Sequence, residues 1–177
     1  MSDKPTFGRY AEIPYDKMTP EQQEGFQVLM ETRGRLPGPA KIYVHNPKLA
    51  KVLGPLGAHF RTGYSLSERE REIAVCVVCS KYRSTYPTGA HEKHAKSAGL
   101  PAEKVDAILS GLPTSFDDPR EQLVYEMSVC LTEGRWVANG LYERALAVLG
   151  HVGVTDTIGL LGFYATVSMT LSFYDVP

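Results

Sequence analysis

The chain has 177 residues, of which 43% are hydrophobic and 22% are charged, and its formal net charge is −1. This length and composition predict one globular domain that buries a core without disulfides or metals. The near-neutral charge gives no reason to expect a nucleic acid or an anionic membrane as a partner.

The N-terminal residues 1–14 are polar and do not predict a signal peptide. No run of the roughly 18 apolar residues that a membrane-spanning helix needs is evident. The cysteines are few, namely Cys76, Cys79 and Cys130. We therefore expect a cytoplasmic protein with reduced thiols and no membrane partner.

Residues 1–17 predict an extended arm, because Pro5 and Pro14 discourage helix and apolar periodicity is weak. Such an arm either wraps a neighbouring subunit or is disordered. Residues 18–177 predict a single helical domain.

The first predicted helix of this domain has clear start and stop signals. Thr19 and Gln22 form a capping box around Pro20, and Gly34 predicts the helix end. A loop with a short helix follows and breaks at Asn46-Pro47. The next stretch, residues 48–63, predicts a helix with a kink near Gly54-Pro55.

A second capping box, Ser67 with Glu70, precedes the apolar run EIAVCVVC. That run would also suit a buried strand. The cap, and the lack of a second strand-like run to pair with, favour helix. Further helices are predicted over residues 87–99, 101–111, 117–134, 140–150 and 154–177, so the fold class is all-α.

Glu72 is the first candidate for chemistry. At about 100° per residue, Glu72, Cys76 and Cys79 share an arc of roughly 60° on one helix. A carboxylate beside such an apolar segment is expected to have a raised pKa, as a general acid or base requires. The alternative is that Glu72 belongs to an exposed charge run, EREREI.

His91 is the second candidate. Pro87 predicts the start of its helix, with Ser84 or Thr85 as the cap, so His91 lies about one turn inside. The helix dipole there disfavours imidazolium and favours a neutral histidine that accepts a proton. Tyr86, at the helix mouth, is placed to donate a hydrogen bond to a substrate oxygen. The alternative for His91 is a solvated residue.

His94 completes an H-x-x-H pattern with His91. A metal would need a third ligand, such as Glu72, and no H-E-x-x-H motif is present, so we expect no metal. The pair Cys76 and Cys79 has redox C-x-x-C spacing but lies within an apolar helix, where core packing is the favoured interpretation. Tyr164, in an apolar C-terminal helix, either packs in the core or lines a pocket.

Four stretches in this order resemble the carboxymuconolactone decarboxylase family, which includes AhpD-like proteins: LPGPAKIYVHNPKLA, LSEREREIA, AHEKHAKSAGL and GFYATVSMTLSFYDVP. The resemblance extends from about residue 35 to the end of the chain. It implies an AhpD-like multi-helix bundle that forms a homo-oligomer, either a trimer or hexamer or else a dimer.

Peroxidase-type members look like E-x(11)-C-x-x-C-x-x-x-H. On this sequence the glutamate falls on Glu72 and the histidine on His91, whereas the cysteine positions fall on Ser84 and Pro87. The redox function of that branch is therefore not expected here. The glutamate and histidine remain, as in the decarboxylase-like branch.

The resemblance implies cofactor-independent decarboxylation of a small unsaturated lactone acid, or a related isomerisation or lactone opening. His91 would move the proton, and Glu72 would orient it or act as the acid. The candidates for substrate binding are Ser84, Tyr86 and His94. Arg83 is a candidate for binding a substrate carboxylate, and the alternatives for this role are Arg35, Arg61 and Arg71. The competing functions are a thiol oxidoreductase or peroxidase-like antioxidant protein that uses Cys76 and Cys79, and a non-catalytic binding protein.

Overall fold

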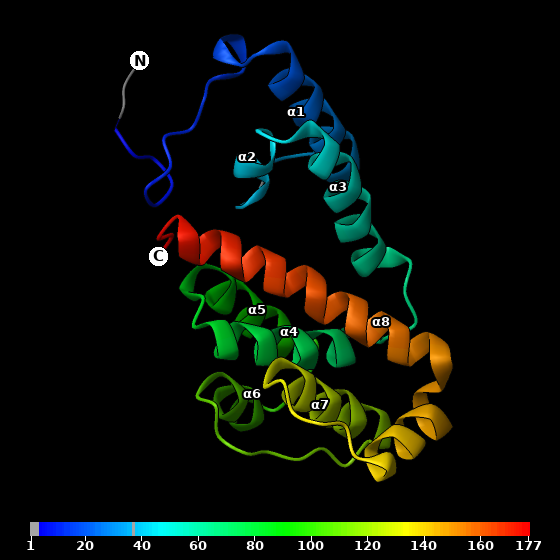
Figure 1. The fold of residues 1–177 in the computed structure, drawn as a ribbon. Coiled ribbons are helices and arrows are strands. Elements are labelled where there is room, and N and C mark those ends of the chain that lie inside the picture. The colour runs from blue at the N-terminus through cyan, green and yellow to red at the C-terminus, as the bar shows by residue number, and fades with distance from the viewer. Residues whose placement is uncertain (1–3, 37) are drawn as a thin grey trace. The chain divides into compact units, whose positions relative to one another are not determined.

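A computed structural model describes residues 4–36 and 38–177 of the chain (Figure 1). The described residues form helices and loops, with one isolated bridge between Phe7 and Tyr10. The chain divides into two compact units, Met1–Tyr64 with Thr170–Pro177, and Ser65–Met169. The division into an arm over residues 1–17 and a domain over 18–177 stays a prediction, and residues 1–3 of that arm lie outside the described range.

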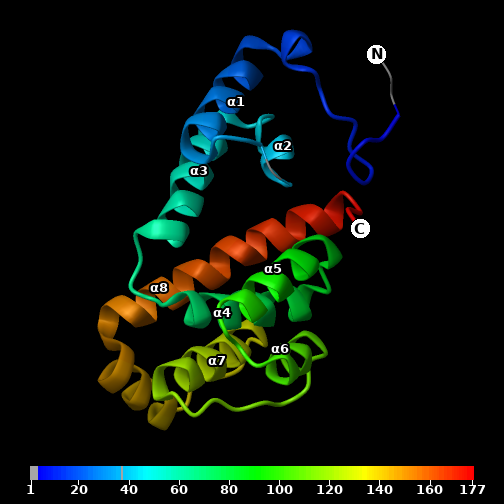
Figure 2. The ribbon, with the colours of Figure 1, turned by 180° about the vertical axis from the view of Figure 1, so that it is seen from behind.

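The first unit is built from a short 3₁₀ helix and three α-helices: η1 (Tyr15–Lys17), α1 (Pro20–Arg33), α2 (Ala40–Tyr43) and α3 (Pro47–Thr62). Helices α1 and α3 pack side by side, as both views show (Figures 1 and 2). The predicted capping box of α1 is confirmed, because Thr19 and Gln22 exchange hydrogen bonds. Helix α3 is assigned as one continuous helix through Pro55.

The N-terminal segment packs on its own chain in this unit. Phe7 and Tyr10 are both buried, and the Arg9 N–H donates to the Tyr174 carbonyl oxygen at 2.6 Å. Gly8 has a positive φ of 58°, and a Cβ there would lie 2.3 Å from the same carbonyl oxygen. Phe7 and Tyr10 therefore have partners within the unit, and contact of this segment with a neighbouring subunit stays a prediction.

The second unit contains α4 (Glu68–Tyr82), α5 (Thr85–Ser97), α6 (Ala102–Leu109), α7 (Pro119–Thr132) and α8 (Asn139–Phe173) as far as Met169. Helix α4 is central and contacts α5, α6 and α7. The apolar run Ile73–Cys79 is buried within α4, so the helical interpretation is confirmed over the strand. Helix α8 runs beside α4 and α5 in both views (Figures 1 and 2).

Buried ion pairs hold α4 against α7. Glu70, which caps α4 together with Ser67, accepts hydrogen bonds from Arg120 at 2.7 and 3.3 Å. Arg69 pairs in turn with Glu121. Both carboxylates are buried, so each needs its guanidinium partner.

Helix α8 joins two segments that the sequence predicts as separate helices. Gly150 has non-helical backbone angles, φ 66° and ψ 175°, so the two helical parts meet at a break there. Contrary to the expectation from sequence, α8 is long and apolar enough to cross a membrane by length and composition alone. Its most apolar window has a mean hydropathy of 1.5, and 33% of that window is buried.

Candidate active site

Glu72 and His91 form a hydrogen-bonded pair inside the second unit. His91 Nδ1 lies 2.7 Å from Glu72 Oε2, although the two residues are nineteen positions apart in sequence. Glu72 is fully buried, and the His91 side chain is 13% exposed. The structure therefore brings together the two residues that the sequence singles out for proton transfer.

A tight turn between α4 and α5 makes this contact. Arg83 ends α4 in the left-handed conformation, with φ 47° and ψ 42°. The Ser84 N–H then donates back to the Cys79 carbonyl oxygen at 3.2 Å. Because the chain reverses in so few residues, α5 returns along α4 and brings His91 to Glu72.

Glu72 is held as a carboxylate. Burial by itself would raise its pKa, but the hydrogen bond and charge of His91 and the neighbouring Arg71 together lower the pKa below its ordinary value. Arg71 Nε donates to Glu72 Oε1 at 2.8 Å. The raised pKa expected from sequence is therefore wrong, because the desolvated carboxylate has two cationic or polar donors.

The protonation of Glu72 decides which nitrogen of His91 is protonated. An ionised carboxylate only accepts hydrogen bonds, so His91 Nδ1 carries the proton and donates it to Oε2. In the neutral ring the other nitrogen, Nε2, then has a lone pair. Among the described residues no hydrogen bond to Nε2 is seen. The arrangement can accept a proton at Nε2 and return it.

Two further rings fix the plane of the His91 imidazole. Tyr164 of α8 lies edge to face against it, with ring centroids 5.0 Å apart, and His94 does so at 5.5 Å. The sequence does not decide whether Tyr164 packs in the core or lines a pocket. In the structure Tyr164 lies against His91. Sequence reasoning named Arg71 only as one of several arginines, although its position next to Glu72 in EREREI was the available signal.

The same cluster has the composition of a metal site. Donor atoms of Glu72, His91 and His94 all lie within 4.8 Å of one another. Histidine nitrogens and a carboxylate oxygen are ligands that zinc accepts. Two of these donors, however, bind each other in the 2.7 Å hydrogen bond. The expectation of no metal stays a prediction.

The hydrogen bonds of Glu72 and His91 among the described residues do not include three other sequence-predicted residues, Arg83, Ser84 and Tyr86. Arg83 follows Glu72 by eleven residues along α4, roughly 16 Å of helix. Ser84 is buried at the start of α5, and its side chain makes no capping hydrogen bond. Tyr86 is 42% exposed and points about 140° around α5 from His91. Their substrate-binding roles stay predictions without support from this geometry.

Helix α5 begins at Thr85, two residues before the predicted start at Pro87. Proline is tolerated there because the first four N–H groups of a helix have no intrahelical partner. His91 consequently lies six residues after the start rather than one turn inside. The helix dipole acts mainly within the first turn, so the Glu72 contact is the stronger influence on the imidazole.

The paired cysteines belong to the core. Cys76 and Cys79 are buried to within 1% of full burial. Burial raises the pKa of Cys76, and it raises the pKa of Cys79 to about 12. Thiols in this state are protonated and inaccessible, which is the reverse of what a redox pair requires.

Comparison with known proteins defines the fold but not the activity. No protein-family model matches the chain, and no curated protein sequence matches it significantly. A solved structure described as an uncharacterized peroxidase-related protein from Silicibacter sp. TM1040 matches with a TM-score of 0.72. It is 17% identical and the match covers 100% of this chain and 94% of that chain. The predicted all-α, AhpD-like multi-helix fold is thereby confirmed.

Proposed function

We propose that the protein is a cofactor-independent acid–base catalyst that acts on a small unsaturated lactone or carbonyl acid, with decarboxylation as the favoured reaction. The observation that carries this proposal is the buried hydrogen bond between Glu72 and His91, which leaves His91 Nε2 to exchange a proton. A positioned histidine contributes typically about 10²–10⁴-fold to a proton-transfer step.

In this proposal the two residues have different tasks. His91 gives or takes the proton at Nε2. Glu72 orients the ring and stabilises the imidazolium, as a buried carboxylate behind a catalytic histidine does. Both oxygens of Glu72 already accept hydrogen bonds, from Arg71 and from His91, so Glu72 is less suited to be the acid itself.

The chemistry needs only these groups and a conjugated substrate. The bond between the ring carbon and the carboxylate breaks, and its electron pair moves into the conjugated lactone carbonyl as carbon dioxide leaves. Protonated His91 then delivers a proton to carbon, which restores the neutral lactone and the neutral imidazole. Without loss of carbon dioxide, the same proton transfers would isomerise the double bond.

A substrate carboxylate calls for a cation near the pair. Arg71 is the better candidate than Arg83, because its guanidinium lies beside Glu72 while Arg83 lies at the far end of α4. The Arg71 side chain is 17% exposed. An anionic substrate would therefore meet Arg71 and His91 on the same side of the α4–α5 pair.

The redox alternative has less support. The similar structure is described as peroxidase-related, but thiol peroxidase chemistry requires an accessible thiolate. Cys76 and Cys79 are buried and protonated, and the positions that carry cysteines in the peroxidase-type pattern are Ser84 and Pro87.

A comparison of two histidine variants tests the proposal. With a carboxylated unsaturated γ-lactone as substrate, we expect carbon dioxide release above the buffer rate and a loss of about 10²–10⁴-fold in kcat for His91→Gln. His151→Gln, at an exposed position of α8, is the matched control and should retain full activity. Prior dialysis against a chelator should change nothing.

The proposal fails if no lactone acid or related carbonyl acid is turned over by the folded protein. It also fails if His91→Gln keeps the rate of His151→Gln on a substrate that is turned over. Circular dichroism of both variants excludes misfolding as the cause of a lost rate.

A further inference from the structure

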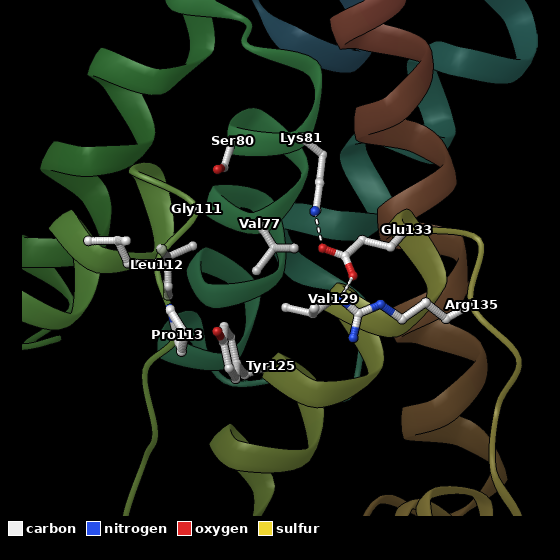
Figure 3. A pocket seen from close by; sticks show the side chains of 11 residues that line it. Val77, Ser80, Lys81, Gly111, Leu112, Pro113, Tyr125, Val129, Glu133 and Arg135 are labelled. Carbon is white, nitrogen blue, oxygen red and sulfur yellow. Dashed lines mark hydrogen bonds and ion pairs between the residues drawn. The ribbon is translucent and has the colours of Figure 1, made fainter.

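A cavity lies in the Ser65–Met169 unit, between α4, α7 and the loop after α6 (Figure 3). Its volume is about 240 Å³. Val77 and Lys81, which line it from α4, lie about 140° and 180° around that helix from Glu72. The cavity therefore opens on a different side of α4 from the Glu72–His91 pair.

The walls of this cavity are mainly apolar. They are formed by Val77 and Ile108, which are buried, and by Val129, Leu112 and Pro113. Leu112 is 59% exposed, so this wall lies at the surface of the unit. Such walls favour a hydrocarbon body over water.

One end of the cavity is positively charged. Lys81 and Arg135 both pair with a single carboxylate, that of Glu133, as Figure 3 shows. The hydrogen bond from Lys81 lowers the pKa of Glu133, which is therefore ionised at neutral pH. Two cations and one carboxylate leave a formal charge of +1 at this end.

Lys81 and Arg135 have N–H donors that the ion pairs with Glu133 do not use. An ammonium group has three N–H donors and a guanidinium five, and Glu133 uses one pairing from each. The Tyr125 hydroxyl accepts a hydrogen bond from the Thr114 N–H at 3.3 Å, so its own proton remains to be donated. Ser80 adds a second hydroxyl to the lining.

We propose that this cavity is a binding site for a small amphipathic carboxylate, whose charged group meets Lys81 and Arg135 and whose apolar body lies against Val77, Leu112 and Val129. The volume is below the roughly 300–1,000 Å³ of sites for drug-sized ligands, so the ligand is small. The inference is independent of the proposed catalytic function, because neither Glu72 nor His91 lines the cavity.

The test uses 3-phenylpropanoate, its uncharged amide 3-phenylpropanamide, and acetate as probes. Titrations followed by methyl NMR should show 3-phenylpropanoate shifting the Val77, Leu112 and Val129 resonances. Both the amide, which lacks the charge, and acetate, which lacks the apolar body, should bind at least about tenfold more weakly.

Two variants with matched controls test each half of the site. Arg135→Gln should weaken 3-phenylpropanoate binding about tenfold, whereas Lys93→Gln, an exposed cation on α5, should leave it unchanged. Leu112→Ser should weaken binding several-fold, whereas Leu49→Ser, at an exposed position of α3, should not.

The proposal is overturned if acid and amide bind equally well, if the three marker resonances do not move, or if Arg135→Gln binds like Lys93→Gln. Arg135 is 65% exposed and Leu112 59% exposed, so neither substitution threatens the fold.

Discussion

Glu72 is fully buried, yet its lowered pKa favours the ionised side chain. Its two oxygens accept hydrogen bonds from Arg71 Nε at 2.8 Å and from His91 Nδ1 at 2.7 Å. A desolvated carboxylate is costly unless such donors are present, so the three side chains depend on one another. Any change in one of them should therefore alter the stability of the fold as well as its chemistry.

The pH dependence of stability tests the charge on Glu72. The pKa of Glu72 is lower in the folded chain than in the unfolded chain, where it is about 4.5. The ionised carboxylate therefore stabilises the fold above pH 4.5, and this contribution is lost as the pH falls through the pKa of the folded state. Glu72→Gln should cost about 1–3 kcal/mol in the free energy of unfolding near neutral pH. Urea unfolding should show that this deficit shrinks below pH 4.5.

Glu103→Gln, at an exposed position of α6, is the control and should show no such dependence. A deficit for Glu72→Gln that is the same at neutral and at acid pH would mean that the side chain is not ionised in the fold.

At the residue scale the sequence was sufficient to choose Glu72 and His91 but not to describe their state. The spacing of the glutamate and the histidine in the family pattern predicts that the two residues act together. The pKa of Glu72 instead depends on the positions of the hydrogen-bond donors around its carboxylate. The sequence shows an apolar helix around Glu72, which argues for a raised pKa. It cannot show that His91 and Arg71 both point at the carboxylate.

At the scale of the elements, local signals predicted the helix starts well. Thr19 with Gln22, and Ser67 with Glu70, cap α1 and α4 because a capping box involves only residues three positions apart. The start of α5 was predicted two residues late, since proline suits several positions of the first turn. The break at Gly150 was anticipated as a helix end, because glycine readily adopts a positive φ.

Glu70 has two roles that meet at the start of α4. It caps the helix and binds Arg120 of α7, and it is 4% exposed. Glu70→Ala should lower the free energy of unfolding by about 1–3 kcal/mol, because it removes a cap and leaves a guanidinium without its partner. Chemical denaturation measures this loss.

The matched control is Glu68→Ala, an exposed glutamate in the first turn of the same helix, which should change stability by less than about 0.5 kcal/mol. Equal losses for the two variants would show that the link between α4 and α7 contributes nothing.

At the scale of the whole molecule, α8 exposes apolar surface in the Ser65–Met169 unit. Ile158 is 50% exposed and Met169 is 52% exposed, and Gly162 between them has open space where a side chain would project. These residues recur at helical spacing and form one stripe. A stripe of this kind favours contact with another apolar surface.

We therefore propose that the chain self-associates through this stripe. Sedimentation velocity should give a mass above that of the 19.5 kDa monomer, and Gly162→Arg should lower it towards that of the monomer because the charge would be buried at the contact. Ala147→Arg, exposed in the part of α8 before the break at Gly150 and so outside the stripe, should leave the mass unchanged. A monomer at high protein concentration, or a Gly162→Arg variant with unaltered mass, would contradict the proposal.

The all-α class was predictable because capped, periodic helices account for most of the chain. The division into two compact units, with a boundary at Ser65 and a return of Thr170–Pro177 to the first unit, was not. That division depends on long-range contacts such as the one between Arg9 and Tyr174, which no local pattern encodes. The same limit applies to Tyr164, whose contact with His91 joins α8 to α5.

The central claim is that a buried carboxylate holds His91 with its proton on Nδ1 and a free lone pair on Nε2. Two-bond ¹H–¹⁵N correlation spectra of the histidine rings report this directly, once the pH is high enough to give neutral imidazole. We predict the Nδ1–H tautomer for His91 in the wild-type protein and its loss in Glu72→Gln. A proton on Nε2, or the averaged pattern of a solvated imidazole, would contradict the account.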